Sequence, residues 1–250
     1  MRMIVSSDWH LDAVTAGVRR YDEHFEYAQA LEKITREQSI DLLVLLGDFF
    51  DPGSMVAHKC ERFLFDAVGR LSEFTRVVLI AGNHDVVEGS DHPTTVLSAM
   101  RQATCYGFGD GAVTVVEEPG VYDFDGKVRL VCLPYVSRAL RYLYSESSRG
   151  FWASATMGPG DELPIVVCGH LTVAGADLGS ESEEFARGTE LDFPATRVAE
   201  LNPAAVFNGH YHKPQTVKLG GVDIVIPGSP QRLTFAETGD YKKGFLVVDV

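Results

Sequence analysis

Short apolar runs recur along the chain, and each is bounded by Gly, Pro or Asp. Runs of this length that are rich in Val, Ile and Leu are typical of buried β-strands. In chain order they read MIV, DLLVLL, RVVLIAG, KVRLVCLP, LPIVVCGH, AAVFNGH, GVDIVIPG and GFLVVDV. The pattern therefore predicts a protein built around β-sheet.

Segments with helical spacing separate the first three of these runs. They cover residues 19–38 and 55–71, and one face of the first segment is apolar: Phe25, Ala28, Leu31 and Ile34. The order strand, helix, strand, helix, strand predicts the start of a parallel α/β sheet. After about Gly109 the helical segments become fewer, which predicts a β-rich second half.

Polar side chains gather directly after several of the predicted strands. The clusters are Asp8 and His10, then Asp48 and Asp51, then Asn83, His84 and Asp85, then His170, and finally His210 and His212. Because ligands bind at the carboxyl ends of strands in open α/β sheets, we expect these side chains to converge. A single Asp or Asn after a strand is often only a helix cap or turn residue, but capping does not select histidine.

The remaining histidines and the cysteines do not join this pattern. His24, His58 and His92 fall on predicted helix or loop surface, where we expect no role. The cysteines are too widely spaced for a metal knuckle or a disulfide framework, so we expect buried, reduced thiols: Cys60, Cys105, Cys132 and Cys168.

Carboxylate, carboxamide and imidazole groups without thiolate suit divalent ions such as Mn²⁺, Fe²⁺ or Zn²⁺. The candidate ligands are too numerous for one ion that keeps an open position: Asp8, His10, Asp48, Asn83, His170, His210 and His212. Two ions that share one bridging carboxylate fit the set better. Such a pair, typically about 3.5 to 4 Å apart, clamps a phosphoryl group and activates water for in-line attack.

Composition limits the other roles that the chain can have. Its 250 residues, of which 45% are hydrophobic, can form one large α/β domain or two small ones. No apolar run approaches the roughly 20 residues of a membrane helix. The first residues also lack the pattern of a targeting peptide, so we expect a cytoplasmic protein without membrane contact.

The net charge of −13 argues against a broad basic surface for nucleic acid, so bound metal ions would have to supply local positive charge.

The ordered motifs D-x-H, GD-x-x-D, GNHD, GH and GH-x-H resemble those of the calcineurin-like metallophosphoesterases, and they extend from Asp8 to His212. The resemblance implies a four-layer α/β/β/α sandwich with a dinuclear site at the sheet edges. We expect a single domain of this kind over residues 1–250. The resemblance assigns Asp8, His10 and His212 to one metal, Asn83, His170 and His210 to the other, and Asp48 as the bridge. It also makes His84 the proton donor to the leaving oxygen. Asp85 is then either the residue that orients His84 or a turn residue.

The tail of the chain narrows the resemblance to the SbcD family of DNA repair nucleases. It contains GHYHKPQ, PGSPQRLTFAE and KGF, and the match includes LPYVSR and the SESEEF loop upstream. Pro52 follows Asp51 where protein phosphatases of the superfamily carry Arg, which counts against phosphoprotein substrates. Arg232 lies in a predicted Pro-Gly turn, where it either contacts a substrate phosphate or only completes the turn.

This resemblance implies an Mn²⁺-dependent exonuclease or endonuclease on DNA, with Fe, Zn, Mg, Ni or Co as alternative metals. It also implies an SbcC-type ATPase partner and a homodimer. SbcD-type chains usually continue into a capping region and an ATPase-binding segment, and neither is expected between Met1 and Val250. Two other functions stay open. The acidity favours a small-molecule phosphodiesterase, acting for example on cyclic nucleotides. The third alternative is a non-catalytic metal-binding scaffold for an ATPase.

Overall fold

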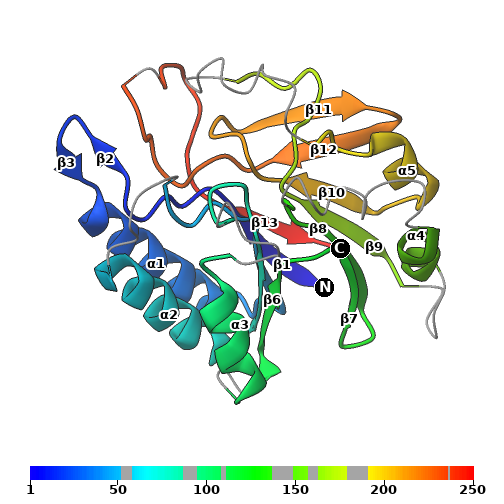
Figure 1. Cartoon of the computed structure of the whole chain (residues 1–250), viewed down its shortest axis with the longest axis horizontal. Coiled ribbons are helices and arrows are strands. Elements are labelled where there is room, and N and C mark those ends of the chain that lie inside the picture. The colour runs from blue at the N-terminus through cyan, green and yellow to red at the C-terminus, as the bar shows by residue number, and fades with distance from the viewer. Residues whose placement is uncertain are drawn as a thin grey trace.

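The computed structural model describes residues 1–51, 58–86, 95–107, 111–136, 149–156, 163–178, 191–235 and 237–250. A five-stranded sheet with the order β13-β1-β4-β5-β6 forms one half of the molecule (Figure 1). Its strands are β1 (Arg2–Ser6), β4 (Leu42–Leu45), β5 (Arg76–Ile80), β6 (Val113–Val116) and β13 (Leu246–Asp249). The first four are parallel, as the alternation of strands and helices predicts, and β13 pairs antiparallel with β1.

A six-stranded sheet with the order β11-β12-β10-β9-β8-β7 forms the other half. Its strands are β7 (Gly120–Phe124), β8 (Val128–Leu133), β9 (Ile165–Gly169), β10 (Ala205–Asn208), β11 (Gln215–Leu219) and β12 (Val222–Ile226). The inner strands run parallel, and β7 and β11 are antiparallel strands at the two edges. A small hairpin, β2 (Val14–Thr15) with β3 (Val18–Arg19), precedes the first helix.

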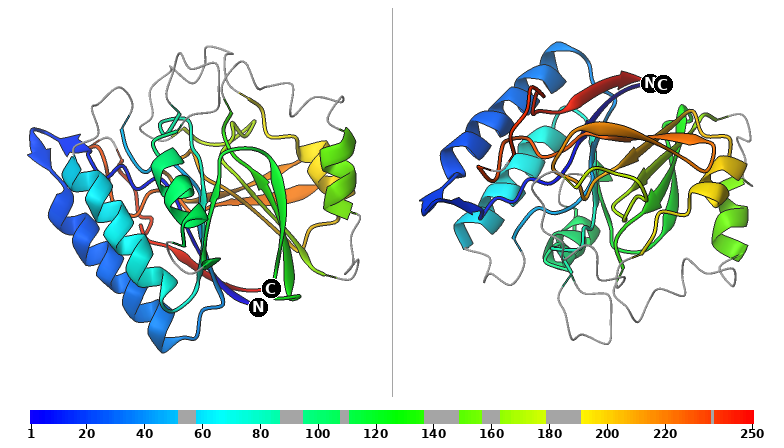
Figure 2. Two further views of the ribbon diagram at one scale, coloured as in Figure 1. Left: turned by 60° about the horizontal axis from the view of Figure 1, so that its bottom comes forward. Right: turned by 90° about the horizontal axis from the view of Figure 1, so that it is seen from above.

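The helices lie on the outer faces of the two sheets (Figure 2). The first sheet is covered by α1 (Tyr21–Glu37), α2 (His58–Ser72) and α3 (Ser98–Cys105), and the second by α4 (Arg149–Thr156) and α5 (Ala195–Glu200). The layers are therefore helix, sheet, sheet and helix, which confirms the predicted α/β/β/α sandwich. No helix in the described part of the chain is long and apolar enough to cross a membrane.

Both faces of the central strands are buried, which explains why these strands are continuous apolar runs in the sequence. Side chains alternate along β1: Met3 and Val5 pack between the two sheets, whereas Ile4 packs against the helices. All three are fully buried. Each such side chain contributes roughly 1.5–3 kcal/mol of transfer free energy. This core holds the strand ends, and thus the loops beyond them, in fixed positions.

The buried face of α1 differs from the predicted one. Its fully buried residues include His24, Ala28 and Leu31, while Phe25 is 44% exposed. The expectation that His24 lies at the surface is therefore wrong: Gln231 Nε2 lies 2.8 Å from His24 Nε2 and donates a hydrogen bond to it. The apolar spacing alone could not show this partner, which lies 207 residues away in the chain.

The remaining predictions concern the other histidines, the segments that resemble the SbcD family, and the cysteines. His58 is exposed, as predicted, whereas His92 and residues 52–57, including Pro52, lie outside the described residues. Residues 137–138 of the LPYVSR match and the SESEEF loop also lie outside them. Cys60, Cys132 and Cys168 are buried free thiols, but Cys105 is exposed at the end of α3, contrary to expectation.

Candidate metal centre

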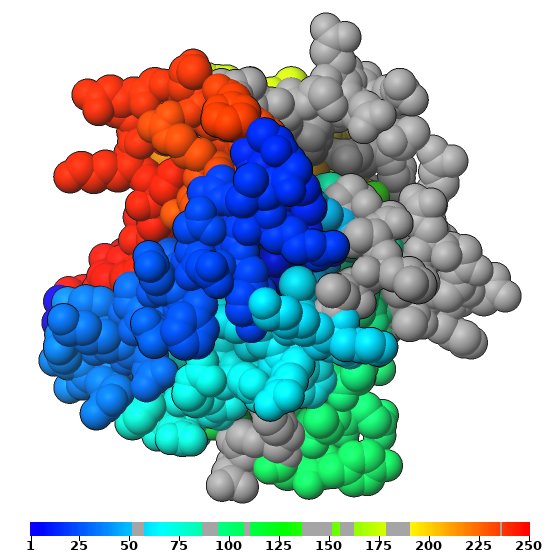
Figure 3. All heavy atoms as spheres, turned by 90° about the vertical axis from the view of Figure 1, so that its left-hand side faces the viewer, coloured from blue at the N-terminus to red at the C-terminus, as the bar shows by residue number. Residues whose placement is uncertain are grey.

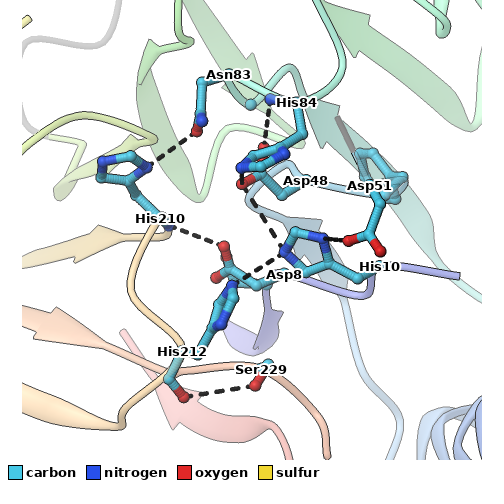
Figure 4. A network of polar contacts seen from close by, with 12 residues as sticks. Asp8, His10, Asp48, Asp51, Asn83, His84, His210, His212 and Ser229 are labelled. Atoms are coloured by element: carbon cyan, nitrogen blue, oxygen red, sulfur yellow. Dashed lines mark hydrogen bonds and ion pairs between the residues drawn. The ribbon is translucent and has the colours of Figure 1, made fainter. Parts of the chain in front are cut away.

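The loops that follow the strands bring the predicted ligands together at one edge of the sandwich (Figure 4). Asp8 and His10 follow β1, Asp48 follows β4, and Asn83 follows β5, all in the first sheet. The second sheet contributes His170 after β9 and the pair His210 and His212 after β10. The predicted convergence at the carboxyl ends of the strands is therefore present in the structure.

The backbone of several of these residues is in the left-handed region that non-glycine residues avoid. The φ angles are 54° at Asp8, 44° at His10, 54° at Asp48 and 80° at His210. This conformation costs roughly 1–2 kcal/mol per residue. Such strain persists only where the surrounding structure enforces it, and it is concentrated at functional sites. The strained turns indicate that the loops are built to direct these side chains rather than to minimise their own energy.

The first ligand group consists of Asp8, His10 and His212, whose ligand atoms all lie within 4.8 Å of one another. His10 Nε2 and His212 Nε2 are 3.0 Å apart. Asp8 Oδ1 accepts a hydrogen bond from the backbone of His210, but the buried Asp8 Oδ2 has no hydrogen-bond partner. Two nitrogens about 2.1 Å from one ion and at right angles to each other lie about 3.0 Å apart. The spacing and the unpartnered carboxylate oxygen both fit one divalent cation.

Asp51 holds His10 in the orientation that this group needs. Asp51 Oδ1 lies 2.8 Å from His10 Nδ1, which leaves Nε2 directed toward His212. A carboxylate on the distal nitrogen of a metal-binding histidine fixes both its tautomer and its ring. The sequence placed Asp51 in the GD-x-x-D motif but gave it no role of its own.

The second ligand group consists of Asp48, His170 and His210, again with ligand atoms within 4.8 Å. The Asn83 side chain lies beside this group. Its Oδ1 is 2.9 Å from both His170 Nε2 and His210 Nδ1. The other ring nitrogen of His170 contacts the Leu46 carbonyl, so its Nε2 faces the group. The structure thus brings together Asn83, His170 and His210, the residues predicted for the second ion.

Asp48 lies between the two groups. Its Oδ2 is 3.2 Å from His170 Nε2 in the second group and 4.0 Å from His10 Nε2 in the first, and the side chain is 1% exposed. Burial opposes ionisation, but the charges of His170 and His84 outweigh it and hold the pKa of Asp48 well below its usual range. A buried carboxylate that stays ionised between two ligand groups is the expected bridge.

The electrostatics of the groups favour cations. Burial alone lowers the pKa of His10, but its hydrogen bond to Asp51 and the charge of Asp48 raise it to about 9. Burial likewise opposes the charged form of His170, yet Asp48 raises its pKa to about 10. Burial raises the pKa of Asp8 to about 6. The carboxylates that hold protons on these imidazoles can hold divalent cations instead, so metal binding is coupled to proton release.

His84 lies beside the shared carboxylate but outside both ligand groups. Its Nε2 is 3.7 Å from Asp48 Oδ2, and 21% of its side chain is exposed. Burial lowers its pKa. A partly exposed imidazole next to the bridging residue occupies a position from which it could donate a proton to a bound substrate.

The family model for calcineurin-like phosphoesterases matches residues 1–214. The chain belongs to this family. Among curated relatives, it is 27% identical over 267 residues to the D subunit of the SbcCD nuclease of Bacillus subtilis (strain 168), covering 100% of this chain and 66% of the relative. The corresponding protein of Escherichia coli (strain K12) is 26% identical, and the match covers 99% of this chain and 64% of the relative. The chain thus spans just under two thirds of the length of these relatives.

Solved structures share the fold of this phosphoesterase. The phosphopantetheinyl hydrolase of Mycobacterium tuberculosis superposes with a TM-score of 0.52 at 15% identity, covering 91% of this chain and 89% of that one. A dimetal phosphatase of Danio rerio gives a TM-score of 0.52 at 15% identity, covering 98% and 91%. At this identity the likeness shows the fold alone.

The contacts of Asp85 favour one of the two roles left open for it, that of a turn residue, over that of a residue that orients His84. Asp85 Oδ2 accepts hydrogen bonds of 2.9 Å from the backbone amides of Asp48 and Gly82, and Oδ1 accepts one from Phe49. His84 Nδ1 is buried without a hydrogen-bond partner. Burial and the charge of Asp48 raise the pKa of Asp85 to about 7. Asp85 instead joins the loop after β5 to the loop that carries Asp48, which agrees with the alternative of a turn residue.

Arg232 is likewise engaged by its own loop rather than by the metal centre. Its guanidinium donates to the carbonyls of Glu237 and Gly239 and lies 5.1 Å from the centre of the Tyr241 ring. Of the two roles left open for Arg232, these contacts favour completion of the turn, and the phosphate contact stays a prediction.

Asn208 is a supporting residue that the sequence did not reveal. Its fully buried side chain donates to the carbonyls of Leu171 and Gly209, both at 2.8 Å, and accepts from the Leu171 amide at 3.1 Å. These bonds join the loops that carry His170 and His210. The signal in the sequence was the NGH triplet, in which Asn is more commonly a turn former.

Proposed function

We propose that this phosphoesterase is a dinuclear, Mn²⁺-dependent phosphodiesterase of the SbcD type that hydrolyses DNA. The observation that carries the proposal is the meeting of two ligand groups at one buried carboxylate, Asp48. Their oxygen and nitrogen ligands, without thiolate, suit Mn²⁺. When bound, two such ions hold a phosphodiester and activate water for in-line attack.

The side chains of the chain itself supply the remaining steps. Asp51 keeps Nε2 of His10 available as a ligand. His84, beside Asp48 and partly exposed, donates a proton to the leaving oxygen, because an alkoxide is a poor leaving group without one. DNA as the substrate is supported by the relatives, which are named as subunits of the SbcCD nuclease. For the same reason the proposal includes a second subunit of the SbcC type.

We expect the purified protein to cleave an aryl phosphodiester faster than the corresponding monoester in the presence of Mn²⁺. EDTA should abolish the activity, and added Mn²⁺ should restore it, whereas Mg²⁺, Zn²⁺, Ni²⁺ and Co²⁺ serve as comparisons. The initial rates of both reactions at equal substrate concentration provide the measurement. A monoesterase rate that equals or exceeds the diesterase rate would contradict the proposal.

A second candidate is a phosphodiesterase for small diesters, and the net charge of −13 favours it. An acidic surface repels the long polyanion of DNA more than it repels a cyclic nucleotide. Single-stranded DNA, duplex DNA and 2′,3′-cyclic nucleotides assayed side by side separate the two candidates. The nuclease proposal expects the single strand to be cleaved most efficiently, and a clear preference for the cyclic nucleotide would replace it.

We expect DNA binding to depend only weakly on salt. Two divalent ions concentrate about four positive charges at the scissile phosphate. The net charge of the chain is −13, so its lysine and arginine side chains offer little basic surface for contacts with neighbouring phosphates. The slope of log K against log salt should correspond to about one to three phosphate contacts rather than six to ten. The measurement is a salt titration with the metal-loaded His84→Ala protein, combined with a time course of product lengths. A steep slope with long, processive digestion would reveal a basic track and overturn this expectation.

A further inference from the structure

The end of the chain contains residues that resemble the SbcD pattern but take no part in the ligand groups. They lie in the segment 229–243, which follows β12. In the structure this segment returns to the backbone of His212, where the Ser229 amide donates to the His212 carbonyl at 3.1 Å. Figure 4 shows the Ser229 hydroxyl beside the same carbonyl oxygen. Gly228 has a φ of +77°, and a Cβ there would lie 2.6 Å from the same carbonyl oxygen. Only glycine permits so close an approach.

Lys243 makes the central contact of this segment. Its ammonium group donates to the His212 carbonyl at 2.6 Å and to Ser229 Oγ at 2.7 Å, and it forms an ion pair with Glu237. Ser229 Oγ donates its own proton to the Gln231 carbonyl, so it is free to accept from Lys243. An ammonium group has three donors, and here it has three acceptors. The side chains of Lys243 and Glu237 are only 8% and 2% exposed.

Glu237 anchors this ion pair in its own loop. Its Oε1 accepts hydrogen bonds from the amides of Leu233 at 2.8 Å and Thr234 at 3.3 Å. The Leu233 carbonyl in turn accepts a bond of 2.6 Å from Thr15 in the β2–β3 hairpin. Figure 3 shows the hairpin, in blue, directly beside the orange and red C-terminal segment. The Lys243–Glu237 pair is therefore connected to the backbone of His212. Through Leu233 and Thr15 it is also connected to the β2–β3 hairpin, which follows His10 in the sequence.

We propose that the Lys243–Glu237 pair is a brace that positions His212 for the first metal ion. The inference rests on the dinuclear site of the proposed function. The brace fixes the backbone of His212 at its carbonyl, while the imidazole reaches to 3.0 Å from His10 Nε2. Lys243 acts through His212 and is a positioning residue. Residues that support metal ligands in this way typically change metal affinity by 10- to 100-fold when they are replaced.

The test is a titration of the metal-free protein with Mn²⁺, followed by calorimetry and by elemental analysis after dialysis. Lys243→Met is compared with Lys242→Met, which makes the same chemical change at the exposed neighbouring position. We expect Lys242→Met to bind two ions like the wild type. Lys243→Met should keep one ion at wild-type affinity and bind the other about 10- to 100-fold more weakly. Asp8→Asn, which removes the negative charge of a ligand of the first group, should weaken the same binding step.

A second variant separates positioning from a loss of folding. Removing one partner of a buried ion pair leaves a buried charge, whereas replacing both partners is often well tolerated. Glu237→Gln/Lys243→Met should therefore unfold at nearly the wild-type temperature in EDTA and still bind the ion of the first ligand group weakly. Wild-type affinity for both ions in either folded variant would overturn the inference. A wild type that binds two ions but cleaves no diester would contradict the proposed function and leave the brace intact.

Discussion

We expect Asp48→Asn to lose both metal ions and nearly all activity. The substitution removes the negative charge that lies within 3.2 Å of His170 Nε2 and 4.0 Å of His10 Nε2. Asparagine keeps the shape of the side chain and can still accept the bond that Asp48 Oδ1 receives from the His84 amide. The fold should therefore persist. Metal ions supply several kcal/mol of transition-state stabilisation, so the rate should fall by roughly 10³-fold or more.

The measurement combines elemental analysis after dialysis with diesterase rates in Mn²⁺. Asp66→Asn serves as the matched control, because Asp66 is an exposed carboxylate on α2 that pairs only with Arg62 in the described contacts. It should bind two ions and keep full activity. If Asp48→Asn retained two ions, Asp48 could not be the bridging ligand, and the assignment of the centre would have to change.

The second large effect concerns His84. We expect His84→Ala to lower kcat on DNA by about 10² to 10⁴ fold and to leave both metal ions in place. The reason is that His84 lies beside Asp48 but outside both ligand groups. His58→Ala, at an exposed histidine of α2, is the control and should not change the rate.

The leaving group provides a further check on this role. Nitrophenolate leaves without needing a proton, so the loss in His84→Ala should be much smaller for a nitrophenyl diester than for DNA. An equal loss on both substrates would show that His84 acts on something other than the leaving oxygen. Loss of metal from the variant would instead make His84 a ligand.

The convergence of the candidate ligands was predictable because strand periodicity and residue type point in the same direction, whereas their division between two metal ions was implied by the family resemblance. An apolar run typical of a buried strand precedes each of Asp8, Asp48 and His170. Parallel strands end at a common edge of the sheet. Neither fact depends on contacts between distant parts of the chain. Strand and helix periodicity likewise predicted the parallel start of the first sheet and the β-rich second half, whereas the four-layer sandwich was implied by the resemblance to the calcineurin-like metallophosphoesterases.

The supporting residues were not predictable from the same signals. Asp85 stands next to His84 in the sequence, yet its carboxylate turns toward backbone amides of another loop, and adjacency in the chain carries no information on that choice. Lys243 lies 31 residues from His212 and touches its carbonyl rather than its side chain. Because every residue has a backbone carbonyl, a hydrogen bond to that carbonyl does not select any residue type at the accepting position. The left-handed conformations of His10 and His210 were not predictable either, because histidine is enriched at positive φ but the great majority of histidines have a negative φ.

The most direct test of the central claim, a pair of ions shared through Asp48, is anomalous diffraction from crystals grown with Mn²⁺. We predict two manganese peaks about 3.5 to 4 Å apart. One should lie against Asp8, His10 and His212, the other against Asn83, His170 and His210, with Asp48 in contact with both. A single peak, or a second ion that does not contact Asp48, would contradict the account.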